Sequence, residues 1–184
     1  MSDPVNEAGP DARTMAWAAR SAADYVGKYA TSRANLEKVI ARRAKRRYPD
    51  IEDGQAREIA RRTAQFFADN SLVDDATFAA AKVRSGVRKG HSRRRIAMGL
   101  SAKGVEAQAI DEAIGEADDL AAALNFAKRR RLGPWRRGDA EPDLMRKEAA
   151  ALGRNGFSGD LVRKVIRMPQ AEAEDFGFEA SASP

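Results

Sequence analysis

Residues 91–104 read HSRRRIAMGLSAKG, and residues 31–44 read TSRANLEKVIARRA. The second residue of both segments is a serine, which can cap a helix, and an arginine follows it. Ile96 and Leu100 then occupy positions that are also apolar in the earlier segment. Apolar residues four apart after a capping serine are typical of a short amphipathic α-helix. The two segments therefore predict that one helical unit occurs more than once in the chain.

A second pair of similar segments lies at a different spacing. Residues 103–114 read KGVEAQAIDEAI and residues 155–166 read NGFSGDLVRKVI, with glycine in the second position and apolar residues in the third, eighth and twelfth. Capped amphipathic helices can resemble one another by chance, so a fold without repeats stays open. Two independent matches in register favour a tandem array.

Hydrophobic periodicity is helical along almost the whole chain, and no segment alternates polar and apolar residues for long enough to suggest a strand. The pattern predicts nine helices in three groups of three. We expect an all-α fold of tandem three-helix repeats (three units) in an elongated, curved array, because each repeat must bury its apolar face against a neighbour. The expected order is a flexible acidic N-terminal tail at 1–12, repeat 1 at 13–72, repeat 2 at 73–117, repeat 3 at 118–169 and a flexible acidic C-terminal tail at 170–184.

Positive charge is concentrated in the body of the chain. The net charge of the 184 residues is +6 at pH 7. The two predicted tails hold seven acidic residues and no basic one, so residues 13–169 hold all 33 basic residues against 20 acidic ones, a net +13. A body this cationic suits a polyanionic partner, such as nucleic acid, a nucleoprotein or an anionic membrane.

One basic segment lies between Asp75 and Glu106, where no acidic residue occurs. Like charges this close repel one another, and no acid nearby in the sequence can neutralise them. We therefore expect them to bind an external anion, although a merely solvated basic face is the alternative. The candidate binding residues here are Lys82, Arg84, Arg88, Lys89, Arg93, Arg94, Arg95 and Lys103.

A second basic segment surrounds Trp135. Its candidate binding residues are Lys128, Arg129, Arg130, Arg131, Trp135, Arg136 and Arg137. The tryptophan could stack on a base or enter a protein pocket, or it could pin its own loop to the core. A third segment, with Arg42, Arg43, Lys45, Arg46 and Arg47, closes a predicted helix. Cations suit a helix C-terminus in any case, so this segment is the least diagnostic.

Nothing in the sequence indicates catalysis, a cofactor or a metal site. Cysteine is absent, His91 is the only histidine, and no phosphate-binding glycine loop is present. Three acid pairs could be general acids or metal ligands, but each directly precedes a helix, where carboxylates cap free N–H groups. We expect the pairs to be caps, His91 to be a turn residue and the protein not to be an enzyme. The pairs are Glu52/Asp53, Asp74/Asp75 and Asp118/Asp119.

The sequence also lacks the signals of membrane insertion and export. No apolar run approaches the roughly 20 residues of a membrane span, and the N-terminus lacks a basic segment followed by an apolar one. We therefore expect a cytoplasmic protein.

Four segments resemble those of a known family in the same order. LVDDATFAAAKVRS at 72–85 resembles the start of the second repeat of the RecX family, regulators of the RecA recombinase. RKGHSRRRIAMGLSAKGV at 88–105 resembles the segment that follows. RRRLGPWRR at 129–137 resembles a linker in the third repeat, and RNGFSGDLVRKVI at 154–166 resembles its last helix. The resemblance covers about residues 20–168, with a departure at Glu148, which takes the position of Ile96 in repeat 2.

The resemblance implies a regulator, mainly an inhibitor, of RecA. Such a protein would lie along the groove of the RecA–DNA filament and suppress its ATPase, its strand exchange and its coprotease activity. The implied partners are the RecA filament and the single- or double-stranded DNA within it, with weak non-specific DNA binding by the protein alone. We expect a monomer, no cofactor and no membrane partner.

A rival hypothesis is a helix-turn-helix protein that binds duplex DNA without RecA. Its recognition helix would span Ser92 to Lys103, because an arginine-rich helix start suits the major groove. An anionic-membrane binder is a third possibility, but no helix combines a basic face with bulky apolar anchors.

Overall fold

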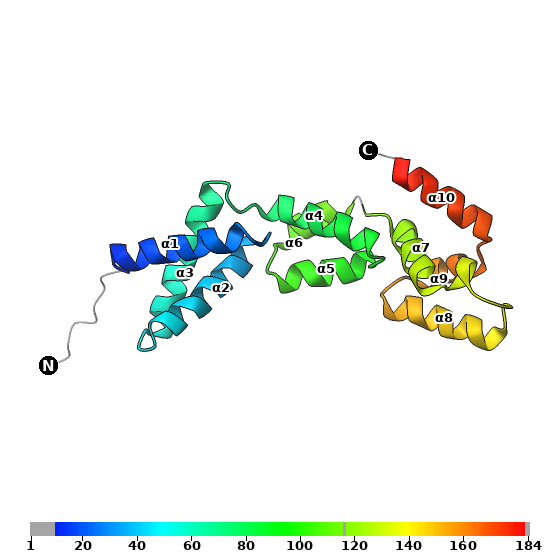
Figure 1. Cartoon of the computed structure of the whole chain (residues 1–184), viewed down its shortest axis with the longest axis horizontal. Helices are drawn as coiled ribbons and strands as arrows, with labels where there is room; N and C mark the ends of the chain where they lie inside the picture. Colours follow the sequence, from blue (N-terminus) through cyan, green and yellow to red (C-terminus); the bar gives the residue numbers. More distant parts are fainter. Residues whose placement is uncertain (1–9, 116, 183–184) are drawn as a thin grey trace. The chain divides into compact units, whose positions relative to one another are not determined.

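The computed structural model describes residues 10–115 and 117–182, with side chains described as far as Phe176, and all regular structure in these ranges is helical (Figure 1). The predicted all-α class is confirmed. The nine predicted helices are present, and a further helix follows them. The elements are α1 Ala12–Val26, α2 Arg33–Arg47, α3 Asp53–Asp69, α4 Asp75–Arg88, α5 Arg93–Ala102, α6 Ala107–Gly115, α7 Asp119–Arg130, the 3-10 helix η1 Gly133–Trp135, α8 Pro142–Arg154, α9 Gly159–Arg167 and α10 Gln170–Ala182.

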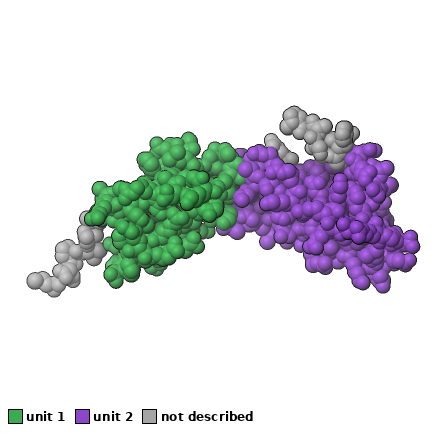
Figure 2. Space-filling view, in the orientation of Figure 1, with its two compact units in different colours: residues 1–78, 103–105 green, residues 79–102, 106–184 purple. Residues whose placement is uncertain are grey.

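The chain forms two compact units (Figure 2). Unit 1 comprises residues 1–78 with 103–105, and unit 2 comprises residues 79–102 with 106–184. This division passes through α4. The boundaries expected between the repeats, at residues 73 and 118, are not tested by this division and stay a prediction.

The core of unit 1 is built by α1, α2 and α3. Leu36, Ile40, Ile59 and Phe67 are buried together, and alanines on all three helices fill the space between them. Small side chains at these positions let the helix backbones approach closely, so that the few large side chains can fill the core at native density.

The core of unit 2 includes the last helix of the chain. Ala173 on α10 is buried with Leu152, Val165 and Ile166, and Phe176 packs against the same cluster. The flexible tail expected from residue 170 is therefore not observed over Gln170–Ala182, which form α10. The acidic composition suggested a solvated tail, but two apolar residues three apart lie on one helical face and dock it to the core.

The predicted N-terminal tail lies mostly outside the described residues, which begin at Pro10. At its end, Asp11 caps α1, because its carboxylate accepts a hydrogen bond from the Thr14 backbone N–H at 2.8 Å. Among the described residues, no helix is both long enough and apolar enough to cross a membrane.

One set of contacts occurs twice, once in each unit. In unit 1, the Ser32 hydroxyl donates to the Lys103 carbonyl at 2.5 Å, and Asp75 accepts from the Arg33 backbone N–H at 2.7 Å. Gly104, next to Lys103, has a φ of +74°.

The corresponding set in unit 2 has the same geometry. The Ser92 hydroxyl donates to the Asn155 carbonyl at 2.7 Å, and Asp119 accepts from the Arg93 backbone N–H at 2.7 Å. Gly156 follows with a φ of +93°. The sequence matched the serines, the arginines and the glycines of the two sets, so the recurring contacts support internal repetition. The number of repeats stays a prediction.

We expect Gly90→Ala to destabilise unit 2 strongly. Gly90 has a φ of +66°, and a Cβ there would lie 2.6 Å from the backbone nitrogen of Phe126. The left-handed conformation alone costs a residue with a Cβ about 1–2 kcal/mol. With the backbone clash, we expect the free energy of unfolding to fall by about 2 kcal/mol or more in a urea titration.

Gly99→Ala is the matched control for this prediction. Gly99 lies within α5, and a Cβ there would have no neighbour within 4 Å. Removing a glycine from a helix interior should raise stability by roughly 0.5–1 kcal/mol. Equal effects of the two substitutions would contradict the description of the Gly90 turn.

Candidate functional site

The basic residues of α4 lie away from its buried face. Phe78, Val83 and Gly86 are buried, whereas Arg84 and Arg88, four residues apart, are exposed. Neither arginine side chain makes a hydrogen bond or an ion pair with any residue in the described ranges. This part of α4 therefore presents two adjacent, unneutralised guanidinium groups to solvent.

The basic start of α5 is arranged in the same way. Ile96 and Leu100 are buried, and Arg94 and Arg95 are exposed. Arg94 has no polar partner among the described side chains, whereas Arg95 donates from Nη1 to the Asn155 side-chain oxygen at 2.8 Å. Met98, 65% exposed, lies one turn beyond Arg94. The outer face of α5 thus carries cations at its start and an uncovered apolar side chain further along.

Two of the remaining candidates of the first segment have a partner within the chain. Lys82 is exposed but engaged in a contact, and Lys103 donates from Nζ to the Asn35 side-chain oxygen at 3.2 Å. The Arg93 backbone N–H is capped by Asp119, while its side chain is exposed. Lys89 is also exposed.

The second basic segment divides into an exposed part and a buried part. Lys128, Arg129, Arg130, Arg131 and Arg137 are exposed. The Arg131 and Arg137 side chains make no hydrogen bond or ion pair within the described part of the chain. These five stay candidates for binding an anion.

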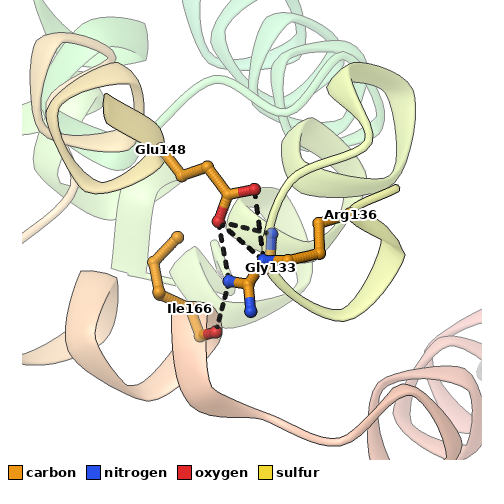
Figure 3. A network of polar contacts seen from close by, with 4 residues as sticks. All are labelled: Gly133, Arg136, Glu148 and Ile166. Atoms are coloured by element: carbon orange, nitrogen blue, oxygen red, sulfur yellow. Dashed lines mark hydrogen bonds and ion pairs between the residues drawn. The ribbon is translucent and has the colours of Figure 1, made fainter. Parts of the chain in front are cut away.

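Arg136 does not belong with them. Its Nη2 lies 2.7 Å from Glu148 Oε2 and donates to the Ile166 carbonyl at 3.0 Å (Figure 3). The Glu148 side chain is 3% exposed and also accepts from the Gly133 backbone N–H at 3.2 Å. The expectation that Arg136 contacts a partner is corrected: a buried carboxylate holds it inside, because such a charge requires a paired cation.

Trp135 lies beside this ion pair and is half-buried. It packs against the core of unit 2, and its indole Nε1 is buried without a hydrogen-bond partner among the described residues. The Lys128 ammonium lies 5.9 Å from the centroid of its ring. Of the alternatives for Trp135, this placement favours the one in which it pins its own loop to the core.

The two basic segments meet at His91. The Arg129 guanidinium donates to the Lys89 backbone carbonyl, and Arg95 extends from the first turn of α5. Burial lowers the pKa of His91 below its ordinary value, and the positive charges of Arg95, Arg129 and Lys89 lower it further. Cations from three segments thus act on one half-buried imidazole.

Asn155 holds this arrangement in place, although nothing in the sequence distinguishes it from the rest of the segment 155–166. It is 4% exposed, and its side chain donates to the Gly90 carbonyl at 2.6 Å while accepting from Arg95. Its backbone carbonyl accepts from the Ser92 hydroxyl. An asparagine side chain with both a donor and an acceptor fits this position.

The acid pairs act mostly as helix caps, and the second member of two pairs reaches another helix. Asp74 accepts from the backbone N–H groups of Ala76 and Thr77, and Asp118 caps α7 in the same way. The backbone hydrogen bond from Thr77 lowers the pKa of Asp74. Asp75 and Asp119 instead cap α2 and α5. Sequence spacing did not reveal these longer-range caps.

The pair Glu52/Asp53 differs from the expectation. Glu52 precedes α3 without a side-chain capping bond, and Asp53 lies 2.6 Å from Lys45 Nζ. Among the described residues, no group of three or more histidine or acidic side chains is placed to hold a metal ion.

The third basic segment, on α2, is largely tied to its own unit. Arg43 donates to the Ser21 carbonyl at 2.7 Å, and Arg47 lies over the Trp17 ring at 5.7 Å. Arg42 and Arg46 line a shallow hollow with Asp53. These contacts within the protein agree with the expectation that this segment says least about an external anion.

Comparison with known proteins identifies relatives along the chain. Residues 74–114 match the family described as RecX, second three-helix domain. The regulatory protein RecX of Agrobacterium fabrum is 35% identical over 171 residues, which cover 93% of each chain. The regulatory protein RecX of Myxococcus xanthus is 32% identical over 153 residues, which cover 79% of this chain and 82% of the relative.

Solved structures show the same fold. A crystal structure of RecX from Lactobacillus salivarius has a TM-score of 0.62 and 19% identity, covering 85% of this chain and 97% of that one. A second crystal structure, of a regulatory protein RecX, has a TM-score of 0.62 and 22% identity, covering 83% of this chain and 71% of that one. The identity of the Agrobacterium relative over nearly the full length of both chains confirms the resemblance seen in the sequence, and the chain belongs to the RecX family of regulatory proteins.

Proposed function

We propose that this protein regulates the RecA recombinase, mainly as an inhibitor, by binding in the groove of the RecA–DNA nucleoprotein filament. Binding there would suppress the ATPase, strand-exchange and coprotease activities of the filament. The protein acts in this proposal as a cytoplasmic monomer without a cofactor, and it is not an enzyme. The relatives, which are named regulatory proteins, support a regulatory role.

The observation that carries the proposal is the set of exposed, unneutralised cations in unit 2. Arg84, Arg88, Arg94, Arg131 and Arg137 are exposed, and their side chains have no hydrogen-bond or ion-pair partner in the ranges that the structure describes. Arg84 and Arg88 are four residues apart on α4. Like charges at this spacing destabilise a helix, and an external polyanion relieves the repulsion. The phosphate backbone of DNA in a nucleoprotein filament provides such a polyanion.

The proposal is tested by measuring RecA-dependent ATP hydrolysis on single-stranded DNA with and without the protein, across a salt series. We expect strong inhibition at low salt that weakens steeply as salt rises, because each neutralised phosphate releases counterions. Hydrolysis that the protein leaves unchanged at every salt concentration would contradict the proposal.

A second candidate function is duplex DNA binding by α5 as a recognition helix. The exposed Arg94 and Arg95 in the first turn of α5 favour it, because the N-terminal residues of a recognition helix contact base edges. This function predicts sequence-selective binding to duplex DNA without RecA. The filament proposal predicts weak, non-selective binding to naked DNA.

A further inference from the structure

Among the described residues where the two basic segments converge, His91 is the one whose side chain ordinarily titrates near neutral pH, and the proposed function does not use it. It lies between Gly90 and the capping residue Ser92, and it is half-buried. The charged groups that act on its imidazole are Arg95 at the start of α5, Arg129 on α7 and Lys89 after α4. Each of these three side chains is exposed.

Hydrogen bonds from two other segments fix the backbone at this position. Asn155, at the end of α8, donates to the Gly90 carbonyl at 2.6 Å and orients Arg95 through a 2.8 Å hydrogen bond. Arg129 donates to the Lys89 carbonyl. The cations are therefore partly ordered before any ligand binds, which reduces the entropy that binding must overcome.

No carboxylate in the described part of the chain neutralises this cluster. None of the four side chains forms an ion pair with an acidic residue that the structure describes. The carboxylate of Asp119 lies at the start of α5 and accepts the hydrogen bond of the Arg93 backbone N–H. The cluster thus has several N–H donors and a net positive charge, and its hydrogen-bond acceptors among the described residues are neutral oxygens, the Asn155 amide and the Lys89 carbonyl.

We propose that His91, Lys89, Arg95 and Arg129 form a binding site for one phosphodiester group of a nucleic-acid strand. Arginine and lysine supply charge-assisted hydrogen bonds to the phosphate oxygens, and the imidazole supplies a further N–H donor beside them. This inference rests on the proposed function, because it names the DNA backbone as the part of the filament that this surface contacts.

Binding of the phosphodiester is coupled to protonation of His91. In the free protein, burial and the neighbouring cations keep His91 neutral to lower pH than an ordinary histidine. A bound phosphodiester adds negative charge, which favours the imidazolium and raises the pKa of His91. Between the two pKa values binding takes up a proton from solvent, so affinity is greatest at low pH and falls as pH rises, by at most about tenfold per pH unit for one proton.

Because His91 is the only histidine in the sequence, its pKa can be followed by NMR without assigning the other resonances of the protein. The chemical shift of its imidazole proton is followed against pH by NMR, using protein from which any histidine tag has been removed. Three samples are compared at equal low ionic strength: free protein, protein with a thymidine oligonucleotide, and protein with inorganic phosphate. We expect a pKa below the ordinary value of about 6.5 in the free protein and a clear increase with the oligonucleotide.

Oligonucleotide affinity against pH is then compared for the wild type and two variants. His91→Gln should lose the pH dependence, because glutamine keeps a donor but does not titrate. Arg167→Gln removes one exposed charge from α9 and should keep the wild-type pH dependence. A matching pH profile in His91→Gln and wild type would overturn the inference.

The NMR result can overturn the inference by itself. A pKa of His91 that the oligonucleotide leaves unchanged, or that only inorganic phosphate raises, would show that no nucleic-acid phosphate binds there. If the protein still inhibits RecA-dependent ATP hydrolysis in that case, the inference fails while the proposed function stands. If the oligonucleotide raises the pKa of His91 but the protein has no effect on RecA-dependent ATP hydrolysis, the proposed function fails while phosphate binding at His91 stands.

Discussion

Glu148→Ala is expected to lower the free energy of unfolding by about 3–5 kcal/mol, the usual cost of removing one partner of a buried ion pair. The Glu148 side chain is 3% exposed and that of Arg136 is 13% exposed. Without the carboxylate, a guanidinium stays in the interior uncompensated, and the Gly133 backbone N–H loses its acceptor. Urea titration monitored by circular dichroism measures the change.

Two variants separate this effect from a general loss of charge. Asp160→Ala removes the carboxylate of an exposed ion pair with Arg163 and should leave stability nearly unchanged, because solvent screens such pairs. Replacing both Arg136 and Glu148 by apolar residues, as Arg136→Met with Glu148→Leu, should be more stable than Glu148→Ala alone. Equal stabilities of Glu148→Ala and Asp160→Ala would contradict the role assigned to the buried pair.

Reversing the exposed charges of α4 and α5 is expected to abolish inhibition of RecA-dependent ATP hydrolysis. The variant carries glutamate at the positions of Arg84, Arg88, Arg94 and Arg95. Each replacement turns attraction for a phosphate into repulsion, so we expect filament binding at low salt to fall by orders of magnitude. Helicity measured by far-UV circular dichroism should change little, because all four side chains are exposed and one hydrogen bond, from Arg95 to the Asn155 side chain, is lost among the described residues.

The controls for this variant address net charge and local structure separately. A second quadruple variant, with glutamate at the positions of Arg57, Arg62, Arg154 and Arg167, has the same net charge, and all four residues are exposed. It should keep most of the inhibition. Because Arg95 also bonds to Asn155, a triple variant that retains Arg95 should still lose inhibition. Equal losses in both quadruple variants would show that net charge alone matters.

The caps and the apolar positions could be predicted from the sequence because they depend on nearby residues. Ser32 and Ser92 cap α2 and α5 as expected, and Ile96 and Leu100 are buried. The matching of Gly104 with Gly156 was correct for the same reason: both end a helix in a left-handed conformation that favours glycine.

Other features depend on contacts between distant segments. In the sequence, Arg136 is indistinguishable from Arg137, yet one binds a buried carboxylate and the other is exposed. In the sequence, Glu148 stands out only as a departure from repeat 2, because its partners Arg136 and Gly133 lie outside its own helix. The convergence of Lys89, Arg95 and Arg129 on His91 likewise depends on how α4, α5 and α7 pack.

The central claim is that exposed cations of unit 2 bind an anionic nucleoprotein filament. It is tested most directly by co-sedimentation of the protein with RecA filaments assembled on single-stranded DNA, across a salt series. RecA without DNA and naked duplex DNA are the parallel samples. We predict strong binding to the filament that falls steeply with salt, and only weak binding to naked duplex. Sequence-selective duplex binding, with no preference for the filament, would contradict the claim and favour the recognition-helix hypothesis.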